Sequence, residues 1–193
     1  MTRPSVAVRE PAPQDVPGLT ELWRDLREIG GRVDRAIPVV TEEGVRSRLR
    51  AVADDPEARA LVAVDGDVVT GMVVLTFAAY APLFEHNAVH VHYLHVREGY
   101  RRHGVGKALL AAATAYADEV GAEFVITSVM PQLRETNRFY ARLGFGPMVV
   151  RRSVPVSVLR RRLSSSGVPC GDEAVARRRT LRRVRAAMAR VAD

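Results

Sequence analysis

Hydrophobic residues in the first half of the chain recur at two spacings, which predict helices and strands in succession. Alternation predicts a short strand over residues 6–9. Spacings of three and four then predict a helix capped by Asp15, with an apolar face of Val16, Leu19, Leu22, Trp23 and Leu26. Thr41 is expected to cap a second helix that reaches about residue 52. The β-rich runs 60–64 and 68–75 flank Asp65-Gly66, which predicts a hairpin.

The second half continues with a strand over 88–96, a short basic loop with three glycines, and the best-defined helix, over 105–120. Gly121 stands where that helix should end. The apolar run 124–129 predicts a strand buried on both faces, followed by a helix over 134–143 and an extended segment over 148–158. The resulting order β-α-α-β-β-β-α-β-α-β is that of an α/β (α+β) chain.

Composition indicates one ordinary globular domain, because 47% of the 193 residues are hydrophobic and 26% are charged. We expect a domain over 1–163, then a linker and tail over 164–193. No apolar run approaches the roughly 18 residues that span a bilayer, and the N-terminus does not resemble a secretory signal, so we expect a cytoplasmic protein. The single cysteine, Cys170, excludes an intramolecular disulfide and a cysteine-based metal cluster.

The net charge of +7 belongs to the end of the chain. Residues 160–193 contain ten arginines against Asp172, Glu173 and Asp193, and the upstream part is neutral. A nucleic-acid-binding fold should carry its basic surface on the globular part, so any nucleic-acid contact is expected only through this tail. The tail fits either an Arg-rich amphipathic helix or a disordered segment.

The segment 94–110 has the pattern of an anion-binding loop. A strand enters a glycine-bearing turn that opens a helix, and the unpaired N–H groups at a helix start attract phosphate. A Walker loop would need Gly in place of Arg101 and Ser or Thr in place of Ala108, which disfavours ATP hydrolysis. A dinucleotide fingerprint would need Gly in place of Leu109, which disfavours NAD. A simple tight turn without a ligand remains an alternative.

Two motifs resemble the GNAT superfamily of N-acetyltransferases. Arg101-Arg102-His103-Gly104-Val105-Gly106 is similar to its R-x-x-G-x-G/A pyrophosphate loop, and Phe139-Tyr140 with Gly144-Phe145 is similar to its F-Y-x-x-x-G-F helix ending. The resemblance implies a mixed, largely antiparallel sheet flanked by helices, acetyl-CoA as co-substrate, and no metal. It also implies a V-shaped CoA site between the strand ending at Val96 and the one beginning at Phe124. The residues that it assigns to CoA binding are Leu94, His95, Val96, Arg101, Arg102, His103, Gly104, Val105, Gly106 and Lys107, and Tyr140 would protonate the departing thiolate.

All five histidines fall between His86 and His103. Strict alternation places His90 and His92 on one face of their strand, with Leu94 and Val96, and places His95 on the other face. The run is similar to the corresponding strand of serotonin N-acetyltransferase, which implies that His90 and His92 carry the amine proton away. A transition-metal pair, or two histidines on a partly solvated strand, remain alternatives.

The sequence predicts an enzyme that acetylates a primary amine on a small molecule or a peptide. Acceptor choice should rest on segments 27–45 and 76–88, where Phe77, Tyr80, Phe84 and Glu85 could line a pocket or fill the core. The family's pantetheine-contacting Asn is Leu133 here, which puts that contact in doubt. A strand near Val150 could pair two copies as a homodimer. The alternative function is a catalytically silent acyl-CoA sensor whose basic tail binds nucleic acid or a protein partner.

Overall fold

The structure is a computed structural model that describes residues 6–30, 40–81, 86–150 and 152–166. The chain divides into two compact units, Met1–Arg138 and Phe139–Asp193. Each unit is described by itself. The arginine-rich part of the tail beyond residue 166, Cys170, Phe84 and Glu85 lie outside the described residues.

The first unit is built on a five-stranded sheet in the order β1-β2-β3-β4-β5. Neighbouring strands are antiparallel except β4 and β5, which are parallel. This confirms the expected mixed, largely antiparallel sheet flanked by helices. The strands are β1 (Ala7–Arg9), β2 (Ala58–Asp65), β3 (Val68–Ala79), β4 (Asn87–Val96) and β5 (Phe124–Thr127).

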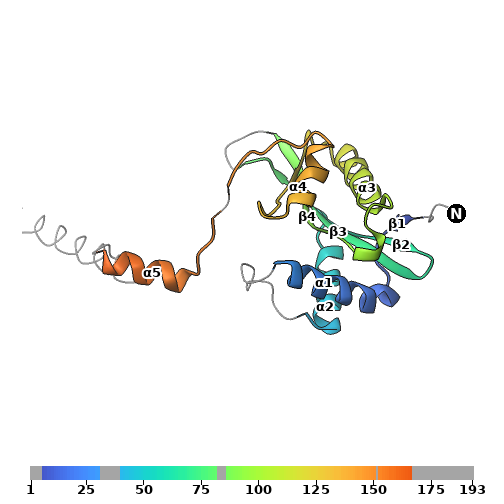
Figure 1. Ribbon diagram of the computed structural model, residues 1–193, viewed down its shortest axis with the longest axis horizontal. Helices are drawn as coiled ribbons and strands as arrows, with labels where there is room; N and C mark the ends of the chain where they lie inside the picture. The colour runs from blue at the N-terminus through green and yellow to red at the C-terminus, as the bar shows by residue number, and fades with distance from the viewer. Residues whose placement is uncertain (1–5, 31–39, 82–85, 151, 167–193) are drawn as a thin grey trace, which may run out of the picture. The chain divides into compact units, whose positions relative to one another are not determined.

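Helices cover both faces of this sheet (Figure 1). The helices α1 (Val16–Gly30) and α2 (Glu42–Ala53) lie on one face, and α3 (Val105–Val120) lies on the other. The core under α1 and α2 is a buried cluster of Val16, Leu19, Leu22, Val45, Val62, Val64, Val69 and Met72. On the opposite face α3 packs tightly, because a Cβ on Gly71 would stand 2.9 Å from Val105 Cγ1. Gly71 therefore lets the start of α3 approach the sheet closely.

Several local predictions are confirmed. Thr41 caps α2 by accepting a hydrogen bond from the Gly44 N–H at 3.1 Å. Gly66, with φ of +59°, lies in the tight turn between β2 and β3. Gly121 ends α3 in the left-handed conformation.

Asp15 was expected to cap the first helix and instead has a different role. It ends a short 3₁₀-helix, Pro13–Asp15, and its buried carboxylate accepts hydrogen bonds from Arg9 at 2.6 and 3.0 Å and from the Ala12 N–H at 2.6 Å. The Arg9 guanidinium lowers the pKa of Asp15 below its usual value. The carboxylate thus ties the end of β1 to the start of α1.

Two further expectations are wrong. The run 124–129 is not buried on both faces, since β5 ends at Thr127 and Phe124 is 43% exposed at the edge of the described sheet. The segment 148–158 is not extended throughout, because α5 (Val156–Ser165) begins after Pro155. Pro155 suits a helix start, and Val156, Leu159 and Leu163 follow at helical spacing.

The remaining helix, α4 (Arg134–Ala141), begins in the first unit and ends in the second. Within the described ranges, no helix combines the length and the apolar character that crossing a membrane requires.

Candidate active site

The loop between β4 and α3 has the geometry of an anion site. A single 3₁₀ turn, Glu98–Tyr100, follows β4, and Arg102 and Gly104 then adopt positive φ angles of 66° and 90°. The first bond of α3 runs from the Ala108 N–H to the Gly104 carbonyl at 2.9 Å. The N–H groups just before Ala108 therefore have no acceptor within the helix. They form the positive end of a 16-residue helix, where a phosphate is stabilised.

The side chains of this loop divide between anchoring and exposure. Val105 is 1% exposed and packs on the sheet, so only its main chain can contact a ligand. Arg101 donates from Nε to the Val96 carbonyl at 3.2 Å, which fixes its side chain along the end of β4. Arg102, His103 and Lys107 are exposed, and a Cβ at Gly104 would meet no atom within 4 Å. The front of the loop is therefore open and basic.

Strands β4 and β5 separate just before this loop. Their parallel pairing begins at Ala88 and Phe124 and ends at Val91 and Thr127. Strand β4 continues to Val96, so its residues 92–96 have no strand partner on that side among the described residues. The family resemblance implies a V-shaped opening between these two strands. Their separation leaves the main chain of Leu94 to Val96 without pairing to β5.

A β-bulge interrupts the pairing of β4 with β3. Val74 lies opposite His92 and Met72 opposite His95, so two steps along β3 match three along β4. The register pairs neither Tyr93 nor Leu94 with β3, and Tyr93 has a φ of 54°. Strict alternation along the sequence cannot reveal such an insertion, so the bulge was not predicted.

The bulge corrects the predicted orientation of His95. Thr76, Val74 and Met72 alternate along β3 and share one face, and their partners are His90, His92 and His95. All three histidines therefore face the α1 side of the sheet, and His95 does not face away from the pair. The prediction that His90 and His92 share a face is confirmed, since their rings stack at 6.1 Å with an interplanar angle of 13°.

His90 and His92 both have hydrogen-bond partners on β3. His92 Nε2 lies 2.9 Å from Thr76 Oγ1, and His90 Nε2 lies 3.4 Å from the Ala79 carbonyl oxygen. Thr76, which the sequence analysis did not select, thus orients the His92 ring. Among the described residues, no group of three or more His, Cys, Asp or Glu side chains is arranged to hold a metal ion.

His95 has a different environment from the pair. It is 6% exposed, and its Nε2 atom is buried without a hydrogen-bond partner in the described structure. The pKa of His95 is lowered to about 4, chiefly by burial and also by the charge of Arg101, while Asp25 of α1 acts in the opposite direction. His95 is therefore neutral near pH 7.

Tyr140 lies in the second unit. It is 5% exposed, and its ring makes edge contacts with Phe139 and Phe145 at centroid distances of 5.2 and 5.1 Å. The Tyr140 carbonyl accepts hydrogen bonds from the N–H groups of Leu143 and Phe145, which close the end of α4. The motif thus forms a compact helix ending around the tyrosine.

Asn137 has a local role. Its side-chain amide donates to the carbonyls of Met130 at 3.0 Å and Leu133 at 2.8 Å. These bonds hold the turn before α4.

An aromatic pair on the α1 side of β4 was also missed. The ring of Trp23, in α1, lies 4.5 Å from the ring of Tyr93 at 71°. The sequence pattern assigns Trp23 only to the apolar face of its helix. Of the residues expected to line an amine pocket, Tyr80 packs against Phe124 at 4.9 Å near the other end of β4, and Phe77 lies opposite Val89.

Comparisons with known proteins give one family and many structures of the same fold. The sequence profile of the Acetyltransferase (GNAT) family matches residues 20–145. No curated protein sequence gives a significant match.

The chain is similar to three solved structures. A transcriptional regulator from Bacillus halodurans has 23% identity and a TM-score of 0.65, covering 78% of this chain and 99% of that one. Glucosamine-6-phosphate N-acetyltransferase from Arabidopsis thaliana has 16% identity and a TM-score of 0.63, covering 79% and 99%. An aminoglycoside N-acetyltransferase in complex with CoA has 14% identity and a TM-score of 0.64, covering 78% and 93%. At these identities the likeness establishes the fold.

Proposed function

Because the chain belongs to the GNAT family of acetyltransferases, we propose that it transfers an acetyl group from acetyl-CoA directly to a primary amine. One observation carries the proposal: β4 separates from β5 immediately before a loop whose N–H groups open α3. An extended thioester arm and a pyrophosphate need these two features side by side.

The loop supplies the pyrophosphate site of this proposal. The main-chain N–H groups of residues 104–107 bind the phosphate oxygens, and Arg102 and Lys107 add charge from exposed positions. The edge of Leu94 to Val96 that β5 does not pair binds the pantetheine arm as a neighbouring strand would. Arg101 acts by holding the end of β4 against the loop.

The chemistry assigned to the residues is acyl transfer without a covalent enzyme intermediate. The amine nitrogen attacks the thioester carbon, a C–N bond forms, the C–S bond breaks, and CoA leaves as a thiolate. The strand register pairs neither Tyr93 nor Leu94 with β3, and we assign the stabilisation of the oxyanion to the main-chain N–H groups of this bulge. His92, held by Thr76 and stacked on His90, receives the amine proton. Tyr140 supplies the proton that the thiolate takes up.

Direct transfer fits the cysteine content. An acetyl-cysteine intermediate would need a thiol near these residues. The only cysteine of the chain, Cys170, is distant in sequence from both motifs. The acceptor therefore attacks acetyl-CoA in a ternary complex.

Release of free CoA thiol from acetyl-CoA tests the proposal, with primary amines and short peptides as acceptors. Tyr140→Phe should lower kcat roughly 100-fold and leave the KM for acetyl-CoA unchanged, because only the proton donor is removed. His92→Gln should lower kcat/KM at neutral pH. As the pH rises, kcat/KM of this variant should recover, since the amine then loses its proton to solvent. The lower kcat of Tyr140→Phe should not recover as the pH rises.

Tight acetyl-CoA binding without thiol release on any amine would contradict the transferase. That outcome would favour the silent acyl-CoA sensor. Activity that Tyr140→Phe leaves intact would remove Tyr140 from the mechanism.

A further inference from the structure

Tyr93 combines backbone strain with an exposed ring. Its φ of 54° is unusual for a residue other than glycine, and its side chain is 50% exposed. Strained residues persist where the surrounding structure holds them, and they concentrate at functional sites, as bulges do. An exposed aromatic ring in such a position indicates a contact surface.

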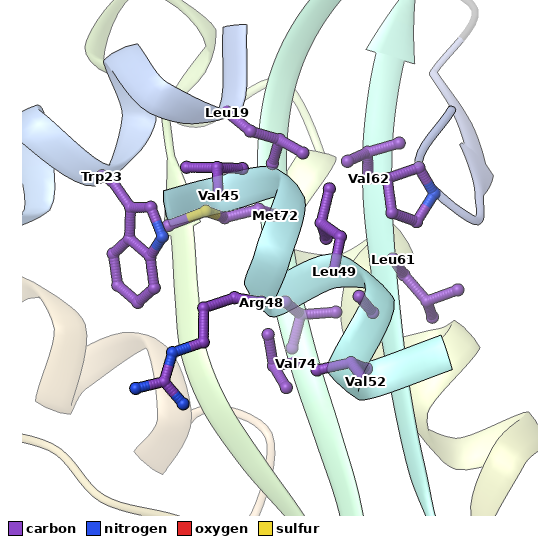
Figure 2. A pocket seen from close by; sticks show the side chains of 13 residues that line it. Leu19, Trp23, Val45, Arg48, Leu49, Val52, Leu61, Val62, Met72 and Val74 are labelled. Carbon is purple, nitrogen blue, oxygen red and sulfur yellow. The ribbon is translucent and has the colours of Figure 1, made fainter. Parts of the chain in front are cut away.

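The ring of Tyr93 is held from one side by Trp23. The two centroids are 4.5 Å apart and the planes meet at 71°, which is a favourable edge-to-face arrangement. Trp23 borders a small apolar hollow of about 60 Å³ between α1, α2 and the sheet, and Figure 2 shows its indole at one side of that hollow. The indole of Trp23 therefore supports the exposed ring of Tyr93.

This aromatic pair adjoins the proton-handling histidines. The ring of Tyr93 lies 6.3 Å from the ring of His92, which stacks on His90. When the nitrogen of an acceptor amine lies at His92, the part of the acceptor attached to that nitrogen lies near Tyr93. The pair is thus located where it can contact the body of the acceptor.

The charges and the rings near the pair bear on the class of acceptor. Arg48 of α2 lines the same hollow as Trp23 and extends on the same side in Figure 2. Its guanidinium repels a second cationic group beside Trp23, and the Asp25 carboxylate of α1, which acts on His95, is the opposite charge on this side of the sheet. The partly exposed rings of Tyr93 and Trp23 favour a flat apolar group, which makes edge or face contacts with them.

We propose that Trp23 and Tyr93 form the specificity wall of the acceptor site and select primary amines that carry a planar aromatic group. This inference rests on the proposed acetyltransferase function. Trp23 and Tyr93 bind the aromatic group, and the amine nitrogen projects toward His92. Neither ring takes part in bond making.

Two amines that differ only in ring shape test the wall: 2-phenylethylamine and 2-cyclohexylethylamine, with spermidine as the polycationic probe. The wild-type enzyme should prefer the flat ring by roughly three- to tenfold in kcat/KM, as expected for one aromatic contact. Tyr93→Asn removes the ring and tolerates the left-handed backbone, so it should abolish this preference, measured as the ratio of kcat/KM for the two amines. Tyr93→Phe keeps the ring and should keep the preference.

Tryptophan fluorescence gives a second readout that needs no turnover. Trp23 is the only tryptophan of the chain, so its emission reports on this wall alone. We expect the Trp23 emission to change saturably with 2-phenylethylamine and to change less with 2-cyclohexylethylamine. In Tyr93→Asn this change should be lost.

The two possible failures are distinguishable. Turnover of amines with equal efficiency on both rings, a preference for spermidine, or an unchanged preference in Tyr93→Asn would overturn the wall and leave the transferase function standing. Absence of turnover on every amine, with acetyl-CoA bound, would overturn the proposed function itself.

Discussion

At the residue scale, the candidate site is marked by residues with positive φ angles. In the part of the chain that the structure describes, Tyr93 and Arg102 are the non-glycine residues with positive φ, and both lie between the bulge and the start of α3. Gly104, with φ of 90°, belongs to the same segment. Strain is therefore concentrated where the acetyl group and the pyrophosphate are proposed to bind.

Gly104→Ala should destabilise the phosphate loop through its backbone alone. Open space surrounds the position, so the cost is that of a left-handed alanine, about 1–2 kcal/mol. The KM for acetyl-CoA should rise and the thermal midpoint should fall. Gly99→Ala is the matched control, since Gly99 also has open space but no positive φ, and it should leave both values nearly unchanged. Equal effects of the two substitutions would contradict this account of the loop.

His95 should make stability depend on pH. Burial lowers its pKa from 6.5 to about 4, so above pH 6.5 both the folded and the unfolded state carry a neutral ring. As the pH falls below 6.5, the unfolded state binds a proton that the folded state does not, which costs about 1.4 kcal/mol per pH unit down to about pH 4.

Denaturant unfolding at pH 7 and pH 5 checks this expectation. Between these values the wild-type protein should lose about 2 kcal/mol more stability than His95→Gln, which has no ring to protonate. The exposed His103 provides the control, since His103→Gln should keep the wild-type slope. Parallel slopes for wild type and His95→Gln would show that His95 is not buried as described.

At the element scale, the site depends on how β4 is paired on its two sides. The bulge against β3 turns His95 toward α1, and the end of pairing with β5 leaves residues 92–96 open. Helix α3 then fixes the loop, because Val105 lies against Gly71 on β3. Strand and helix must therefore pack closely for the loop to keep its place.

Gly71→Ala should disturb this packing. Its Cβ would stand 2.9 Å from Val105 Cγ1 and 3.0 Å from the His95 carbonyl, so we expect a loss of about 1–3 kcal/mol and a higher KM for acetyl-CoA. Adding Val105→Ala should recover part of the loss, which a double-mutant cycle by denaturant unfolding measures. Gly146→Ala, with no atom near its Cβ, is the control. Strictly additive effects of Gly71→Ala and Val105→Ala would refute the contact.

At the scale of the whole molecule, charge is distributed unevenly. Residues 167–193 contain seven arginines and three acidic residues, whereas the chain before residue 160 is neutral. Both motifs of the proposed transferase precede this segment. Catalysis and the basic tail are therefore expected to be separable.

Removal of residues 167–193 should leave the KM for acetyl-CoA within about twofold of the full chain, because both motifs precede this segment and charges that do not touch the phosphates are screened beyond about 10 Å at 0.1 M salt. The truncated chain should leave a cation exchanger at lower salt. Thiol release and salt elution measure the two effects. A large rise in KM would place part of the tail in the CoA site.

The sequence alone determined the features that depend on neighbouring residues. Local spacing and caps predicted α3, the Thr41 cap, the β2–β3 turn and the strand–loop–helix around Gly104, and alternation placed His90 and His92 together. These hold because helix period, strand period and glycine conformations act over a few residues.

Only the tertiary structure decided where the local rules are interrupted. The extra residue in β4 arises from its pairing with β3, so no periodicity within β4 could reveal it or the orientation of His95. The Trp23–Tyr93 contact and the separation of β4 from β5 likewise join segments far apart in the chain. Such contacts are set by packing between elements, whereas the sequence pattern records only which residues are apolar.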